Sequence, residues 1–155
     1  MKTVTVTVYA LSELTGRARE NALDLMRGDA VESTVCDYKE AAEGLFDALP
    51  CRAGRTLTGE DIRAAANKVG TSFAFDLADE CIEAAARAGK LETYTDEAFT
   101  VDEAFDGIAA AEKKYVRKTI NGALIFFSDS YLEERAAECD YYFTAAGKLF
   151  TGEAA

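Results

Sequence analysis

Two segments with the alternating pattern of a β-strand stand at opposite ends of this chain, and the sequence between them has helical spacing. Residues 3–9 (TVTVTVY) place three valines on one face and threonines on the other, which is the two-residue period of a half-buried strand. Residues 141–150 (YYFTAAGKLF) also alternate, turn through Gly147 and return, as a β-hairpin does. An isolated strand and an isolated hairpin are both marginal in water, so we expect them to join in one small antiparallel sheet.

Several helices are predicted between the strand segments, because apolar residues there recur every three or four positions. The expected helices cover residues 15–28, 29–49, 58–70, 71–88, 100–127 and 128–139. The predicted N-caps are Thr15, Thr58, Thr100 (with Glu103 in a capping box) and either Ser128 or Ser130 (with Glu133). Gly28 is interpreted as the end of the first helix, Pro50 ends the second, and residues 121–122 could bend the fifth. Residues 71–76 also fit a strand, although a helix is preferred. The predicted class is α+β, with a small antiparallel sheet covered by five or six helices.

One domain is the simplest interpretation of 155 residues, of which 49% are hydrophobic and 29% charged, with a single proline. A chain of this length can bury about two-thirds of the surface that it exposes when unfolded, which favours one α+β domain over residues 1–155. No run approaches the roughly 20 apolar residues of a membrane span, and the N-terminus alternates instead of forming the apolar core of a signal peptide. We therefore expect a cytoplasmic protein without a membrane partner.

Catalytic chemistry is limited by the lack of histidine in the sequence. Neither a Ser-His-Asp nor a Cys-His arrangement can form, and no glycine-rich phosphate-binding motif occurs. The four cysteines form no C-x-x-C pair, so a zinc centre is not expected, and Cys36, Cys81 and Cys139 are interpreted as small hydrophobes beside helical apolar stripes. We predict no catalytic residue, no metal site and no cofactor. In one alternative, clustered carboxylates hold magnesium or manganese.

Acidic residues are concentrated in one part of a chain whose net charge is −11. Residues 76–106 hold ten acids against Arg87 and Lys90, a net charge of −8. Four acids between positions 76 and 83 of a helix would space negative charge at roughly 3.5 Å, close to the phosphate spacing of one DNA strand. Solubility alone also explains an acidic surface. With two tyrosines as aromatic anchors, the predicted partner-binding residues are Asp76, Asp79, Glu80, Glu83, Asp96, Glu97, Asp102, Glu103, Asp106, Tyr94 and Tyr141.

Each end of the chain carries a recognisable motif. The run VYALSELTGRARENALDLMR has a strand followed by an E-L-S/T motif, alanines every four residues and a closing arginine. The tail FFSDSYLEERAAECDYYFTAAGKLF has a serine-capped acidic helix and a Y-x-F-T-x-x-G-K-x-F hairpin. Both motifs resemble the corresponding ends of a family of small uncharacterised proteins of bacteriophages and prophages. The middle of the chain departs from the family's pattern, which often has an aromatic, glycine-rich strand after the second helix. The family has no agreed activity, although some members are labelled antitoxin-like. The resemblance therefore implies a mobile-element origin more than a mechanism, and it assigns no catalytic residue.

The charge pattern and the resemblance together support three functional hypotheses. The first is a non-enzymatic phage accessory protein that occupies the basic channel of a host nucleic-acid-handling defence complex, as an anti-CRISPR protein or a similar inhibitor would. Its partner would be a basic host protein or ribonucleoprotein, and direct nucleic-acid binding is not expected because the one basic cluster, at residues 113–118, is short. The second is an antitoxin-like partner of one cognate protein, and the third is a metal-dependent carboxylate hydrolase. A homodimer through an exposed strand edge is a further option.

Overall fold

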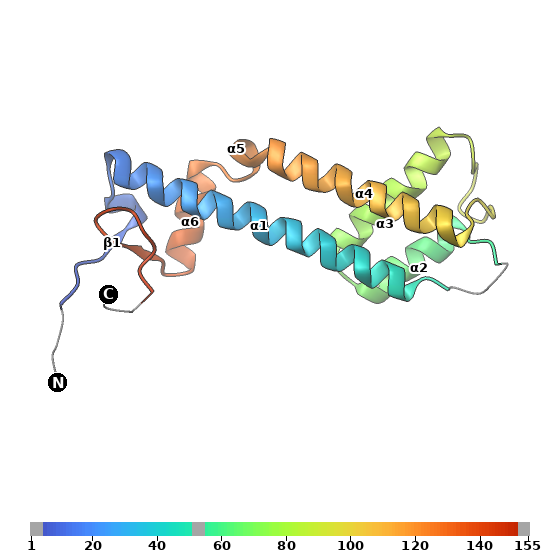
Figure 1. Cartoon of the computed structure of the whole chain (residues 1–155), viewed down its shortest axis with the longest axis horizontal. Helices are drawn as coiled ribbons and strands as arrows, with labels where there is room; N and C mark the ends of the chain where they lie inside the picture. The colour runs from blue at the N-terminus through green and yellow to red at the C-terminus, as the bar shows by residue number, and fades with distance from the viewer. Residues whose placement is uncertain (1–4, 51–54, 152–155) are drawn as a thin grey trace. The chain divides into compact units, whose positions relative to one another are not determined.

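The structure is a computed structural model that describes residues 5–50 and 55–151. Within these ranges the protein is mostly helical, with one two-stranded antiparallel sheet (Figure 1). The elements in chain order are β1 (Tyr9–Ala10), a short 3-10 helix η1 (Leu11–Glu13), α1 (Gly16–Ala48), α2 (Gly59–Val69), α3 (Ser72–Arg87), α4 (Val101–Asn121), α5 (Ala123–Phe126), α6 (Asp129–Glu138) and β2 (Tyr142–Phe143). The predicted α+β class is confirmed.

The chain divides into two compact units. The first unit combines the residues up to Glu32 with those from Asn121 onward, and the second unit is Ser33–Ile120. Each unit has its own cluster of buried apolar side chains. Helix α1 begins in the first unit and ends in the second. The expectation of one domain over residues 1–155 stays a prediction.

The first unit contains the sheet. β1 pairs antiparallel with β2, with Tyr9 opposite Phe143 and Ala10 opposite Tyr142. The chain then turns, and Phe143 forms a further antiparallel bridge with Leu149. The core of this unit joins the sheet to η1, the first half of α1 and α6 through Leu11, Leu14, Ala22, Leu23, Met26, Leu132, Ala136 and Phe143. The predicted union of the N-terminal strand with the C-terminal hairpin is therefore confirmed.

The N-terminal strand is shorter than its sequence pattern predicts. β1 contains only Tyr9 and Ala10, residues 5–8 have no strand assignment, and Thr3 and Val4 lie outside the described residues. The reason lies in the partner strand. Beyond Phe143 the backbone N–H of Thr144 donates to the Lys148 carbonyl at 2.8 Å, so the chain turns away where it would have to pair with residue 8.

The turn of the C-terminal hairpin depends on Gly147. Its φ of +83° lies in the left-handed region that favours glycine. A side chain there would also collide with the backbone carbonyl of Ala18 on α1. The neighbouring Ala146 carbonyl accepts a hydrogen bond from the Asn21 amide at 3.2 Å. The predicted glycine turn is confirmed, and the hairpin lies directly against the first turns of α1.

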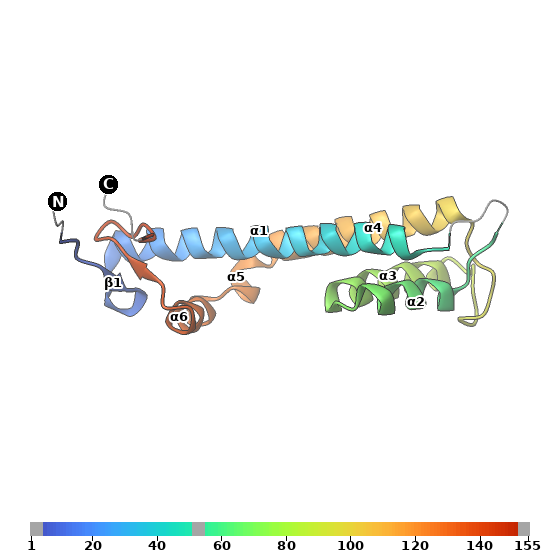
Figure 2. The same ribbon diagram turned by 90° about the horizontal axis from the view of Figure 1, so that it is seen from below.

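The second unit is a four-helix arrangement. The second half of α1 and α4 form one layer, and α2 and α3 pack side by side on one face of it (Figure 2). The largest fully buried side chains here include Leu45, Leu57, Ile62, Leu77 and Ile108. Aromatic side chains extend this core, and the rings of Tyr38 and Tyr115 stack with their centroids 5.2 Å apart. The unit therefore has a hydrophobic core of its own.

The predicted break at Gly28 is wrong, because α1 continues through it from Gly16 to Ala48. A glycine ends a helix when it adopts a positive φ, as Gly70 does at the end of α2. Gly28 does not have a positive φ, and it lies on an exposed side of α1, where a β-carbon added to it would have no neighbouring atom within 4 Å. One long helix therefore replaces the two that the sequence predicts.

Most of the predicted helix boundaries are confirmed by their caps. Thr58 and Asp61 exchange hydrogen bonds at the start of α2, and Thr100 and Glu103 do the same at the start of α4. Residues 72–76 are helical, as preferred, because α3 starts after the cap Thr71. The predicted bend near residue 122 is a break between α4 and α5. The cap of α6 is Ser128, whose hydroxyl accepts from the Tyr131 N–H at 3.3 Å.

Candidate functional site

Helix α3 carries the first four predicted partner-binding acids, and Glu80 among them is buried. Only 8% of this residue is exposed. Its carboxylate accepts hydrogen bonds from Lys114 on α4 and from Arg87 on α3, each at 2.8 Å. The bond from Lys114 holds the pKa of Glu80 below its usual range, against the opposing effect of burial. Glu80 is therefore a neutralised link between two helices, and the predicted row of four exposed acids is interrupted.

Two more acids of α3 have partners inside the second unit. The Tyr38 hydroxyl donates to the Asp76 carboxylate at 3.2 Å, and burial together with this negative charge raises the pKa of Tyr38. Asp79 pairs with Arg63 of α2 at 3.2 Å. Glu83 is exposed and has no ion pair among the described residues. Of the four α3 acids, Glu83 is thus the one most accessible to a partner.

Asp96 stabilises the loop between α3 and α4. Its carboxylate accepts from the backbone N–H groups of Glu92 at 2.7 Å and Thr93 at 3.0 Å. These bonds, with that from Thr93 the larger effect, keep the pKa of Asp96 below its usual range. The side chains of Glu92 and Glu97 in the same loop remain exposed. Asp96 therefore shapes the loop that presents its two acidic neighbours.

The start of α4 adds further acids. Glu103 caps the helix and pairs with Lys90 at 2.7 Å, and the bond from Lys90 is the main reason that the pKa of Glu103 is lowered. Asp102 and Asp106 are exposed and form no ion pair with any described residue. We use the term "92–106 acids" for Glu92, Glu97, Asp102 and Asp106. They are the exposed carboxylates that the structure leaves accessible along this segment.

A shallow groove of about 310 Å³ lies beside these acids, between α3 and α4. Ala85 and Phe99 contribute to its apolar lining, and Glu103 and Asp106 add carboxylates. Gly107 allows the helices to approach, because a side chain there would come within 2.7 Å of the Cys81 sulfur. Burial raises the pKa of Cys81 to about 11, so its thiol stays neutral. The groove thus combines an apolar lining with the carboxylates of Glu103 and Asp106.

The two predicted tyrosine anchors lie in different units. Tyr94 is 44% exposed, and the Arg63 guanidinium lies 4.5 Å from its ring centroid and donates to its hydroxyl at 3.2 Å. Tyr94 is therefore close in sequence to the 92–106 acids but already in contact with a cation of the same chain. Tyr141 belongs to the first unit, where it is half-buried against the core. The structure does not bring Tyr141 together with the acids within one unit.

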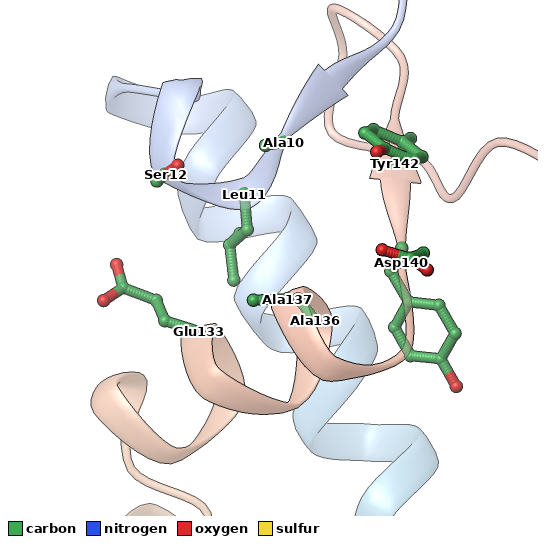
Figure 3. A pocket seen from close by; sticks show the side chains of 9 residues that line it. Ala10, Leu11, Ser12, Glu133, Ala136, Ala137, Asp140 and Tyr142 are labelled. Carbon is green, nitrogen blue, oxygen red and sulfur yellow. The ribbon is translucent and has the colours of Figure 1, made fainter.

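A second pocket, of about 300 Å³, lies in the first unit between η1, α6 and the start of β2 (Figure 3). Leu11 and Ala136 contribute to its apolar part, while Glu133 and Asp140 lie on its opposite sides (Figure 3). Glu133 forms an ion pair with Arg19. Asp140 has a φ of +53°, which is uncommon for a residue other than glycine. The carboxylates are thus separated across the pocket, and one of them is already paired.

Sequence reasoning missed an exposed apolar segment at α5. Leu124 is 74% exposed, Ile125 82% and Phe126 48%, and none of the four residues of α5 is buried. The sequence does contain a signal, because residues 119–128 (TINGALIFFS) hold no charge and their apolar residues are consecutive instead of spaced for one helix face. Contiguous exposed apolar side chains are typical of interaction surfaces.

The positions of possible metal ligands and of cysteines within residues 5–50 and 55–151 bear on the sequence predictions for both. In these ranges no three His, Cys, Asp or Glu side chains are grouped so that they could hold a metal ion. Cys81 is buried as predicted, but Cys36 and Cys139 are exposed, because each lies on the outer side of its helix or helix end. Cys51 lies outside the described residues.

Among the helices that the structure describes, none combines the length and apolar character needed to span a bilayer. No protein-family model, no curated protein and no solved structure matches the chain.

Proposed function

We propose that this chain is a non-enzymatic binding protein that inhibits a basic, nucleic-acid-handling partner, such as a host defence protein or ribonucleoprotein. The observation that carries the proposal is the set of 92–106 acids, which are exposed and unpaired among the described residues within a stretch of net charge −8. Charges at the rim of an interface speed association with an oppositely charged partner and select against other surfaces.

In the proposed mechanism the contacting acids are the 92–106 acids, in place of the row of four acids on α3. Glu80 is enclosed by Arg87 and Lys114, and Asp79 is paired with Arg63, so α3 does not present a regular row of phosphate-like charges. The 92–106 acids extend instead along a loop and the first turns of α4. The partner surface that fits them is a basic patch or channel, with an apolar side chain able to enter the adjacent groove.

The phage and prophage resemblance of the two chain ends supports the proposed class of target. Small inhibitors of nucleic-acid-binding defence complexes need no catalytic chemistry, and the chain lacks histidine. In this proposal it acts in the host cytoplasm, as an anti-CRISPR or similar anti-defence protein, and blocks access of nucleic acid to its partner.

The experiment compares two variants of equal charge change in a bacterial host with an active RNA-guided nuclease. The first variant carries E92Q, E97Q, D102N and D106N. The control carries E20Q, D29N, E32Q and E40Q, which change four exposed α1 acids that form no ion pair among the described residues. Plaque formation by a targeted phage measures inhibition of the nuclease.

Wild-type protein and the α1 control should both raise plaque formation, and the 92–106 variant should lose most of this effect. An exposed ion pair contributes about 0.2–1 kcal/mol, so the loss of four pairs should weaken binding by about 0.8–4 kcal/mol, or about fourfold to several hundredfold. Equal inhibition by both variants would show that the 92–106 acids are not the contact surface. If both variants lose inhibition equally, the inhibition depends on the net charge of the protein and not on the position of the 92–106 acids.

A second candidate function, an antitoxin-like partner of one cognate protein, is favoured by α5. Its exposed Leu124 and Ile125 provide the kind of apolar contact that dominates the affinity of many stable complexes. Capture from host lysate with the L124S/I125S variant distinguishes the two candidates. Loss of a single captured protein in this variant, with capture unchanged in the 92–106 variant, supports the antitoxin-like function.

A further inference from the structure

The N-terminal segment before β1 has a strong preference for strand structure and no strand partner among the described residues. Thr5, Val6, Thr7 and Val8 are β-branched, which favours an extended, paired backbone. Val6 is 40% exposed, and Thr5 and Thr7 are exposed as well. Such a segment presents backbone N–H and C=O groups that another strand can satisfy.

The sheet itself leaves one side of β1 open to pairing. β2 lies at the centre, because it pairs with β1 on one side, while its other side receives the returning chain through the Phe143–Leu149 bridge and a 2.8 Å bond from the Phe150 N–H to the Tyr142 carbonyl. The hairpin turns at Thr144, so β2 cannot extend to residues 5–8. The sheet therefore uses only the side of Tyr9 that faces Phe143, and the pairing potential of residues 5–8 and of the other edge of Tyr9 is not used within it.

We propose that residues 5–9 pair with the same residues of a second copy of this chain, as an antiparallel two-stranded ladder centred on Thr7. This two-fold register places Val6 opposite Val8 and Thr5 opposite Tyr9 of the other copy. In this register the two residues that face each other are always an even number of positions apart in the sequence. Valine therefore faces valine and threonine faces threonine or Tyr9, so the segment is complementary to itself.

Charge also favours a second copy at this position. Two molecules with a net charge of −11 repel each other, and they can approach most closely where both surfaces lack charge. Residues 3–12 (TVTVTVYALS) are uncharged and include the whole proposed ladder. Like charges directly opposite one another, which destabilise a strand pair, are thereby avoided. A ladder of five residues is small, so the dimer is expected to be weak and to dissociate on dilution.

The register is tested by disulfide formation between single cysteines, in a chain whose Cys36, Cys51 and Cys139 are replaced by serine; buried Cys81 is retained. Residues directly opposite each other in an antiparallel pair have Cα atoms about 4.5–5.5 Å apart, which suits a disulfide. T7C should therefore form a covalent dimer at least about tenfold faster than V6C or V8C alone, because pairing raises its effective concentration. A mixture of V6C and V8C should form the mixed dimer at the fast rate.

Sedimentation at several hundred micromolar protein provides the second measurement. Wild-type protein should show a concentration-dependent dimer, and V6P should be monomeric. The backbone groups of Tyr9 face Phe143, so alternation along the strand directs the Val6 N–H to the open edge, where proline would remove a donor that the ladder needs. T151P, a proline at an exposed position after the hairpin, should dimerise like the wild type. The proposal is overturned if the wild type stays monomeric, if V6P still dimerises, or if T7C and V6C form disulfides at equal rates.

Discussion

Replacing Glu80 with glutamine should destabilise the second unit by about 1–2 kcal/mol at pH 7. The carboxylate side chain is only 10% exposed, whereas its partners Arg87 and Lys114 are 59% and 56% exposed. Removing one member of a fully buried pair is destabilising by about 3–5 kcal/mol, and breaking an exposed pair by less than about 1 kcal/mol. Because water can solvate both released cations, and glutamine retains one acceptor oxygen, the effect should lie between these limits. For a chain of this size it corresponds to a fall in Tm of about 3–6 °C.

The same substitution has a predicted pH dependence. The hydrogen bond from Lys114 lowers the pKa of Glu80 in the folded state below that in the unfolded state. Ionised Glu80 therefore stabilises the fold fully above the unfolded pKa of about 4.3, and this stabilisation is lost as the pH falls through the lower folded pKa. The difference in stability between wild type and E80Q should be constant near neutral pH and shrink below about pH 4.

Urea unfolding followed by circular dichroism measures both effects, with E83Q as the control. Glu83 lies on the same helix but is exposed and without an ion pair among the described residues, so E83Q should change stability by less than about 0.5 kcal/mol. If E80Q and E83Q are equally stable at pH 7, or if their difference persists unchanged to pH 3, the assignment of Glu80 as a charged link between α3 and α4 is wrong.

Three further predictions concern other parts of the fold, and a fourth concerns metal binding. G147A should lower the stability of the first unit by at least about 1–2 kcal/mol in thermal unfolding, because alanine is strained at φ +83° and would collide with the Ala18 carbonyl. G28A, in the open interior of α1, should instead raise stability by about 0.5–1 kcal/mol, and a loss there would contradict the continuous helix. L124S/I125S should leave the Tm within about 2 °C of wild type, since both side chains are exposed; a larger fall would mean that α5 packs within the fold. Manganese should neither raise the Tm nor produce hydrolysis that D76N/D79N removes, and a metal-dependent rise would revive the hydrolase hypothesis.

The parts of the fold that the sequence predicts correctly are those decided by residues close together in the chain. The capping pairs at Thr58 and Thr100 involve residues three positions apart, and Gly147 needs a positive φ within its own turn. Gly28 has no such local requirement, so its interpretation as a helix end had no physical basis beyond residue type. The length of β1 depends on a turn that lies more than a hundred residues away, which no local pattern can show.

The candidate site was predictable in composition but not in accessibility. A count of acids identifies the 76–106 segment, and the structure retains Glu92, Glu97, Asp102 and Asp106 as exposed carboxylates. Such a count cannot show that Lys114, 34 residues away, reaches Glu80. Tertiary pairing therefore decides which acids remain available to a partner. The apolar run at α5 was visible in the sequence, but only the structure shows that it is not part of a core.

The most direct test of the proposed function is the salt dependence of binding to the protein captured from host lysate. Its dissociation constant should be measured from about 50 to 500 mM salt for the wild type, the 92–106 variant and the four-site α1 control. Because charges at the rim of an interface determine its salt dependence, wild type and control should weaken steeply with salt, and the 92–106 variant should bind more weakly with a flatter dependence. Identical slopes for all three proteins would contradict the account.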